Sequence, residues 1–83
     1  MAPINVHIKL YSILKDYGRN NGMGSEFTLQ VEPGTTLDHI REQLGIPEKR
    51  IGRYLKKARP LQPDYVVADG DAIDILPPMI SGG

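Results

Sequence analysis

The sequence predicts an α+β fold in which a mixed sheet of about four to five strands packs on one main helix. Two segments near the start, Ile4–Leu10 and residues 26–32, alternate apolar and polar side chains, which is the period of a half-buried strand. A later segment, Leu37–Leu44, repeats its apolar residues at the spacing of a helix. Because two strands cannot bury their apolar face alone, we expect this helix to cover them.

Composition limits the class of protein. The chain has 83 residues, of which 40% are hydrophobic and 24% charged, as is typical of one soluble globular domain. No apolar run approaches the ~18 residues of a membrane helix, and the start of the chain lacks the pattern of a signal peptide, so we expect a cytoplasmic protein with no membrane partner. The chain has no cysteine, which excludes disulfides, thiolate metal sites and cysteine catalysis. Basic and acidic residues cancel, which argues against a dedicated nucleic-acid-binding protein.

The first part of the chain predicts two strands joined by a short helix and a loop. Residues 11–17 are compatible with one or two helical turns, which Gly18 would end. Three glycines within residues 18–25 predict a mobile loop. The second strand, residues 26–32, then meets a turn at Pro33-Gly34. The first strand is expected to bury every second residue: Ile4, Val6, Ile8 and Leu10.

The main helix has both a start and a stop signal. Thr35 or Thr36 can cap it by accepting a backbone N–H. Gly45 suits its end, and Pro47 prevents it from resuming. Its buried stripe consists of Leu37, Ile40 and Leu44.

The second half of the chain predicts short strands. We expect one at Arg53–Lys56, a turn at Lys57-Ala58 and a return through Leu61 that prolines confine to the sheet edge. The Asp69-Gly70-Asp71 turn leads into the last strand, Ala72–Leu76, with Ile73 and Ile75 inward. We therefore expect a folded domain over residues 1–76 and an extended tail over residues 77–83.

Candidate catalytic and metal-binding residues are few. His7 and His39 are expected to face solvent, and neither has the further ligands that a metal site needs. Asp69, Asp71 and Asp74 crowd one turn without the spacing of a calcium loop, so we interpret them as turn formers on an exposed strand face. The sequence predicts no enzyme active site, no metal site and no bound cofactor.

Charge is concentrated in residues 49–59, which hold six of the ten basic residues. One interpretation is a solvated edge strand that discourages aggregation. The other is a docking patch for an acidic partner surface, with Arg53, Lys56 and Lys57 as candidate contacts. Nucleic acid is disfavoured as the partner, because Tyr54 is the sole aromatic residue within this run.

The carboxyl-terminal tail is the most informative feature. It has no charged side chain, two prolines at its base and two glycines, Gly82 and Gly83, at its end. Glycine removes every side chain that could obstruct a narrow channel, and a fully extended tail reaches at most ~23–25 Å. A frayed terminus is the alternative interpretation. The candidate partner-binding residues of the tail are Pro77, Pro78, Met79, Ile80 and Ser81.

Residues 67–83 resemble the end of the MoaD/ThiS family of sulfur carriers, and most closely the small subunit of molybdopterin synthase. The resemblance lies in the Asp69-Gly70-Asp71 turn, the apolar strand after it, the Pro77-Pro78 pair and the Gly82-Gly83 end. The Pro33-Gly34 turn before the helix fits as well. This resemblance implies a β-grasp, ubiquitin-like fold, which agrees with the order of the predicted elements.

The resemblance also implies a function. An E1-like adenylating enzyme would use ATP to activate the carboxylate of Gly83, and a sulfur atom would then convert it to a thiocarboxylate. Gly82 would keep the end of the tail narrow, because glycine has no side chain. Because the chain has no cysteine, the sulfur must come from an external donor. The tail would then insert into the larger molybdopterin synthase subunit and donate sulfur to a pterin precursor.

Other functions remain open at this stage. The same tail suits a sulfur carrier for thiamine synthesis or tRNA thiolation. It equally suits a ubiquitin-like modifier that is joined to other proteins through Gly83, because the adenylation step is shared. A β-grasp interaction module with an idle tail is the third possibility. As a carrier or a modifier the chain is a substrate or subunit of partner enzymes, and in no case do we expect it to be an enzyme on its own.

Overall fold

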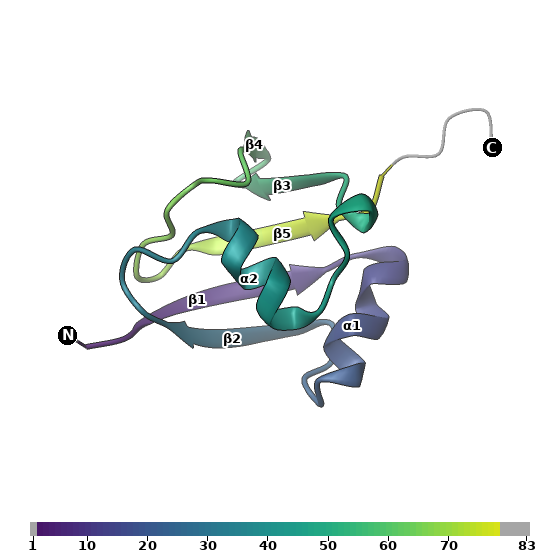
Figure 1. The fold of residues 1–83 in the computed structure, drawn as a ribbon, viewed down its shortest axis with the longest axis horizontal. Helices are drawn as coiled ribbons and strands as arrows, with labels where there is room; N and C mark the ends of the chain where they lie inside the picture. The colour runs from purple at the N-terminus through teal and green to yellow at the C-terminus, as the bar shows by residue number, and fades with distance from the viewer. Residues whose placement is uncertain (1, 79–83) are drawn as a thin grey trace.

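A computed structural model describes residues 2–78 as one five-stranded sheet with a helix across one face (Figure 1). The strands lie in the order β2-β1-β5-β3-β4. Strand β1 pairs antiparallel with β2 and parallel with β5, and β3 pairs antiparallel with both β5 and β4. The α+β fold with a mixed sheet is therefore confirmed. The elements are β1 (Ile4–Leu10), η1 (Ser12–Leu14), α1 (Lys15–Asn20), β2 (Glu26–Val31), α2 (Leu37–Leu44), η2 (Glu48–Arg50), β3 (Arg53–Lys56), β4 (Arg59–Leu61) and β5 (Ala72–Leu76).

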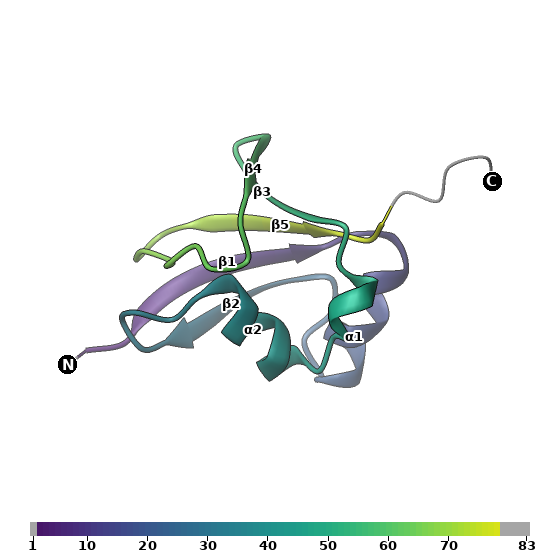
Figure 2. The same cartoon turned by 45° about the horizontal axis from the view of Figure 1, so that its top comes forward.

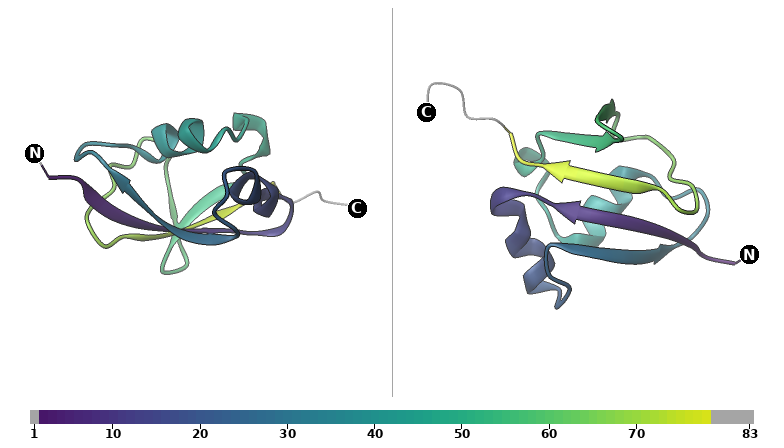
Figure 3. Two further views of the ribbon diagram at one scale, coloured as in Figure 1. Left: turned by 90° about the horizontal axis from the view of Figure 1, so that it is seen from below. Right: turned by 180° about the vertical axis from the view of Figure 1, so that it is seen from behind.

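The core lies between the sheet and α2, and the opposite sheet face is open (Figure 3). Val6, Ile8 and Leu10 of β1 are buried, as the alternation predicts, and Ile4 at the start of the strand is partly buried. Helix α2 has the predicted bounds and buries the predicted stripe of Leu37, Ile40 and Leu44. The other buried apolar residues include Leu14, Ile46, Tyr54, Val67, Ile73 and Ile75.

Helix α2 begins and ends as the sequence predicts. The Thr36 hydroxyl accepts the His39 N–H at 3.2 Å, and the His39 ring accepts the Thr36 N–H at 3.4 Å. These two bonds satisfy backbone donors that the first helical turn leaves unpaired. At the other end Gly45 adopts a φ of 78°, which an L side chain rarely tolerates.

The predicted stop at Gly18 is wrong. Helix α1 continues through Gly18 to Asn20, so the predicted loop over residues 18–25 begins three residues too early. Gly18 is buried, and a Cβ atom there would overlap with the carbonyl oxygen of Gly24. A close approach of two backbone segments therefore explains this glycine, whereas Gly22 and Gly24 adopt the positive φ angles of a turn.

The β3–β4 hairpin has the predicted turn and edge position. Lys57 and Ala58 both adopt positive φ angles, 52° and 67°, and β4 ends the sheet. The hairpin curls away from the face that α2 covers, so its tip projects on the open side (Figure 2). Within residues 2–78, no helix has the length and hydrophobicity needed to span a membrane.

Candidate functional site

The base of the carboxyl-terminal tail is held rigidly by the sheet. Strand β5 lies between β1 and β3, so both sides of its last residues are bonded. The Tyr11 N–H donates to the Ile75 carbonyl at 3.2 Å, and the Gly52 N–H donates to the Leu76 carbonyl at 2.7 Å. Because neighbours on two sides bind β5 as far as Leu76, the chain leaves the sheet at a defined place and direction (Figure 1).

Gly52 is a site residue that the sequence analysis missed. A Cβ atom on Gly52 would lie 2.5 Å from the Pro77 carbonyl carbon and 2.6 Å from the Pro78 nitrogen. Ordinary contact begins at 3.4 Å, so a side chain there would displace the Pro77–Pro78 peptide. The signal in the sequence was a glycine next to the predicted strand Arg53–Lys56, at a place where no turn was expected. The structure shows that no turn requires this glycine, because its φ angle is not positive.

The predicted tail contacts divide into two groups. Pro77 is half-buried beside Gly52, and Pro78 is exposed. Arg53 pairs in register with Leu76, so this predicted partner contact does lie at the tail base. The predicted residues Met79, Ile80, Ser81, Gly82 and Gly83 lie outside the described residues, and their roles stay predictions.

The other cationic candidates lie at the hairpin tip, away from Arg53. Lys56, Lys57 and Arg59 line a hollow together with Leu61 and Tyr65. Lys57 is exposed, whereas Lys56 is half-buried and its ammonium group lies 2.7 Å from an Asp71 carboxylate oxygen. The basic run is therefore not one continuous patch of free charges.

The expectation that Asp71 is an exposed turn residue is wrong. Its exposed fraction is 5%, and its carboxylate accepts bonds from Lys56, from the Tyr65 hydroxyl at 2.9 Å and from the Ala68 N–H at 2.8 Å. Burial by itself would raise the pKa of this carboxyl, but the bonds from Lys56, Ala68 and Tyr65 outweigh burial and hold the pKa below its ordinary value. The same contacts, first with Asp71 and then with Tyr65, raise the pKa of Lys56. This cluster ties β3 to the turn before β5.

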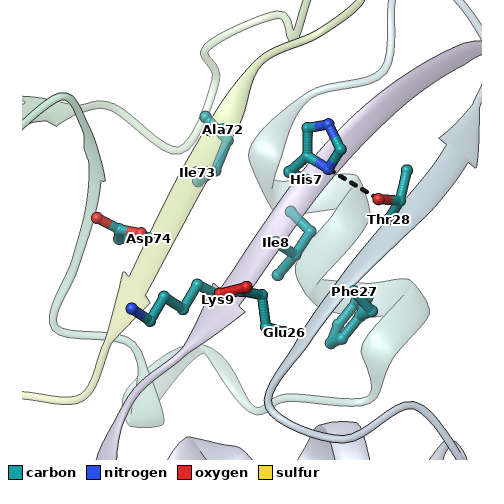
Figure 4. A pocket seen from close by; sticks show the side chains of 9 residues that line it. All are labelled: His7, Ile8, Lys9, Glu26, Phe27, Thr28, Ala72, Ile73 and Asp74. Atoms are coloured by element: carbon teal, nitrogen blue, oxygen red, sulfur yellow. Dashed lines mark hydrogen bonds between the residues drawn. The ribbon is translucent and has the colours of Figure 1, made fainter.

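The open sheet face carries a shallow polar hollow (Figure 4). Lys9 lies opposite Glu26 on one side and Asp74 on the other. Tyr11, and then Glu26 and Asp74, raise the pKa of Lys9. This row therefore holds one cation between two carboxylates.

The two histidines are exposed, as the sequence predicts. His7 lies on the open face, where its Nδ1 atom is 2.7 Å from the Thr28 hydroxyl, and His39 caps α2. Over residues 2–78, no three His, Asp or Glu side chains converge as metal ligands would. The part of the chain best suited to a chemical role is therefore the tail, whose base is held by the sheet.

Comparison with solved structures identifies the fold. The HVO 2177 protein of Haloferax volcanii is similar, with a TM-score of 0.74, 16% identity and coverage of 98% of this chain and 89% of that one. Small archaeal modifier protein 1 of Haloferax volcanii has a TM-score of 0.66 and 16% identity, covering 92% and 99%. A Pyrococcus furiosus protein described as molybdopterin converting factor, subunit 1, has a TM-score of 0.68 and 15% identity, covering 92% and 99%. These likenesses confirm the ubiquitin-like β-grasp fold.

Comparison of sequences identifies the family. No curated protein sequence matches this chain significantly. The sequence profile of the Mut7-C ubiquitin family matches residues 3–81, which is almost the whole chain. The predicted relationship to ubiquitin-like proteins is thereby confirmed, and the likeness to the Pyrococcus furiosus protein adds the shared fold. The chain belongs to the Mut7-C ubiquitin family.

Proposed function

We propose that this chain is a cytoplasmic sulfur carrier whose Gly83 carboxylate is adenylated by an E1-like enzyme and converted to a thiocarboxylate. The observation that carries the proposal is the tail base. The Gly52 and Tyr11 bonds to β5 hold the chain firmly as far as Leu76, and the uncharged sequence that follows ends in Gly82-Gly83. A rigid base with a slim end suits delivery of a carboxylate into a narrow active site.

The chemistry requires activation by a partner. A carboxylate is a poor electrophile, because its oxygen is a poor leaving group. Transfer of AMP from ATP to the Gly83 carboxylate would release pyrophosphate and make AMP the leaving group. The outer sulfur of an external persulfide donor would then attack the carbonyl carbon and AMP would depart, which leaves an acyl disulfide between the chain and the donor. A thiol reductant would cleave the S–S bond and release the thiocarboxylate.

We further propose molybdopterin synthesis as the pathway, with the larger molybdopterin synthase subunit as the sulfur acceptor. Two observations support it: the Pro77-Pro78 pair followed by Gly82-Gly83, and the similarity to a protein described as molybdopterin converting factor, subunit 1. Thiamine synthesis and tRNA thiolation are the alternative acceptor pathways for the same thiocarboxylate.

Protein modification is the second candidate function. It is favoured by the similarity to small archaeal modifier protein 1. Adenylation of Gly83 would be common to both functions, and they differ in the acceptor. A modifier would form an amide bond to a lysine amine and would carry no sulfur.

The experiment is mass analysis of the chain after co-expression with the adenylating enzyme of its own cell. The proposal requires that Gly83 carries the free carboxylate, which the mass of the terminal fragment establishes. Replacement of one oxygen by sulfur adds ~16 Da. Because methionine oxidation adds a similar mass, the fragment must contain Ser81, Gly82 and Gly83 without Met79.

Three outcomes are distinguishable. A heavier terminal fragment supports the sulfur carrier. Gly83 linked to lysines of other proteins, without added sulfur, supports the modifier instead. An unchanged fragment in the presence of active enzyme, ATP, sulfur donor and reductant contradicts both functions. Deletion of Gly83 is the control, and it should abolish either product while changing the unfolding free energy by less than about 0.5 kcal/mol.

A further inference from the structure

The two edges of the sheet differ in their protection. Strand β4 has three residues and contains Pro60, which has no N–H to offer; it begins with the exposed Arg59, and the exposed Lys57 precedes it. Short length, proline and positive charge are the means by which proteins block edge pairing. Strand β2 has six residues, Glu26–Val31, and contains no proline, glycine or lysine. The β2 edge therefore lacks the devices that protect β4.

The hydrogen-bond pattern shows which backbone groups of β2 point outward. The Leu10 N–H donates to the Ser25 carbonyl at 2.7 Å, so this pair is a bonded pair of the antiparallel ladder. Bonded pairs alternate along such a ladder. The residues of β2 that bond to β1 are therefore Phe27, Leu29 and Val31.

The intervening residues, Glu26, Thr28 and Gln30, direct their N–H and C=O groups away from β1. The other side of β1 agrees with this pattern, because the His7 N–H donates to the Asp71 carbonyl and the Asn5 carbonyl accepts from Gly70, both at 2.8 Å. Among residues 2–78, no backbone or side-chain group bonds to the Thr28 or Gln30 amide. The edge thus offers a row of regularly spaced donors and acceptors.

The side chains along this edge define what it would accept. Phe27 is half-buried on the core side, and Thr28 and Gln30 are exposed on the open face. Two exposed carboxylates, Glu26 and Glu32, lie at the two ends, and neither is within 4.0 Å of a cationic group of the described residues. Lys9 lies opposite Glu26 on β1 but is shared with Asp74 on its other side. No cation lies between them in the sequence. The edge is therefore apolar on one side and negatively charged at both ends.

We propose that the β2 edge binds an extended, basic peptide segment of a partner protein, which pairs with β2 as an antiparallel strand. Its backbone would bond to Thr28 and Gln30, its apolar residues would lie beside Phe27, and cations six positions apart would lie opposite Glu26 and Glu32. A second copy of this chain fits less well. Its β2 strand, Glu26–Val31, has no cation to place opposite Glu26 or Glu32, and the antiparallel register that brings Glu26 of each copy opposite Glu32 of the other would pair like charges.

This surface is separate from the tail base. Strand β1 lies between β2 and β5, so a strand added to β2 would not contact Leu76 or Gly52. A partner could therefore hold the protein by this edge while an enzyme acts on its tail. The proposal goes beyond the proposed function and does not depend on it.

The test is titration of the isotope-labelled full chain with a synthetic peptide, KVTVTVK, with blocked ends. This probe places cations six positions apart, threonines opposite Thr28 and Gln30, and valines on the core side. We expect saturable NMR shifts at Thr28 and Gln30, with slower exchange of these two amides and no change in β4. Glu26→Gln and Glu32→Gln should each weaken binding by about threefold, as loss of one exposed charge pair predicts.

Control peptides separate strand pairing from simple charge attraction. EVTVTVE should not bind, because its carboxylates would oppose Glu26 and Glu32. Methylation of the two threonine nitrogens removes the N–H groups that face β2 and should abolish binding. Methylation of two valine nitrogens alters N–H groups that face away, so binding should persist.

Contrary results are equally specific. No saturable shift with KVTVTVK, or equal binding by both charge forms, overturns the proposal. Shifts confined to the open-face row around Lys9 and Asp74 also overturn it, since they would indicate binding to the sheet face. Concentration-dependent shifts at Thr28 and Gln30 without peptide would assign the edge to a second copy and overturn the proposed partner.

Discussion

Substitution of Gly52 by alanine tests whether close packing of the backbone defines the base of the tail. The added Cβ would lie 2.5–2.6 Å from atoms of the Pro77–Pro78 peptide, where ordinary contact begins at 3.4 Å. The Pro77 carbonyl oxygen would lie closer still, so the two segments must separate by about 1 Å. Both are backbone, so no flexible side chain can absorb this movement. The 2.7 Å bond from the Gly52 N–H to the Leu76 carbonyl would lengthen or break.

The expected loss of stability follows from these two effects. A lost backbone hydrogen bond costs ~0.5–1.5 kcal/mol, and overpacking in a rigid core costs ~1–3 kcal/mol. Pro77 is half-buried and Pro78 is exposed, so the tail can yield outward more easily than a core strand. We therefore expect Gly52→Ala to lower the unfolding free energy by about 1–2 kcal/mol.

The assay combines urea denaturation with hydrogen exchange of the Gly52 amide. The matched control is Gly70→Ala, which replaces a glycine with a φ of 86° and no atom within 4 Å of the new Cβ. Its cost of about 1 kcal/mol would come from backbone strain alone. Gly52→Ala should expose the Gly52 amide to exchange and slow adenylation of Gly83, whereas Gly70→Ala should do neither.

Two results would refute this reasoning. One is an unfolding free energy of Gly52→Ala within about 0.3 kcal/mol of the unchanged protein, together with a protected Gly52 amide. That result would mean that the tail base adapts without cost. The other is equal slowing of adenylation by both variants, which would assign the effect to global stability and not to the tail.

Three further predictions concern the core, the hairpin and the buried carboxylate. Ile40→Ala should cost ~2–4 kcal/mol in urea denaturation, because this side chain is fully buried and would leave a cavity beneath α2. Replacement of Lys57 and Ala58 by Asn and Gly should raise the unfolding free energy by about 1 kcal/mol, because both positions have positive φ angles; an unchanged urea midpoint would argue against strain. The pKa of Asp71 is lowered from 3.8, so its contribution to stability is present above that value and is lost as the pH falls through the lower folded pKa. Asp71→Asn should therefore lower stability at neutral pH and flatten its decline from about pH 5 to about pH 2, as denaturation at several pH values would show.

Local patterns were sufficient to predict the elements that carry their own signals. Residues Ile4–Leu10 and Leu37–Leu44 have the predicted bounds, because alternation and helical spacing report directly which side of an element is buried. The Thr36 cap and the Gly45 stop are also local, since each acts on backbone groups within four residues. The interpretation of the tail rests on composition and resemblance alone, and it stays a prediction.

Gly18, Gly52 and Asp71 show where this reasoning fails. Each has a role that depends on a contact absent from the local pattern: Gly18 with Gly24, Gly52 with Pro77, and Asp71 with Lys56. A glycine at a close approach looks the same in a sequence as a glycine in a turn. A buried aspartate after a glycine likewise looks like an exposed turn residue.

The sequence by itself determined the strand faces and the capped helix, because periodicity and capping act over one or two turns of chain. The tertiary structure decided which backbone groups hold the base of the tail and which cations of the basic run are paired with a carboxylate. Those properties arise where β5 inserts between β1 and β3, which brings Tyr11, Gly52 and Leu76 together from separate parts of the chain. Pairing of distant strands depends on the packing of the whole sheet, and no short segment encodes it.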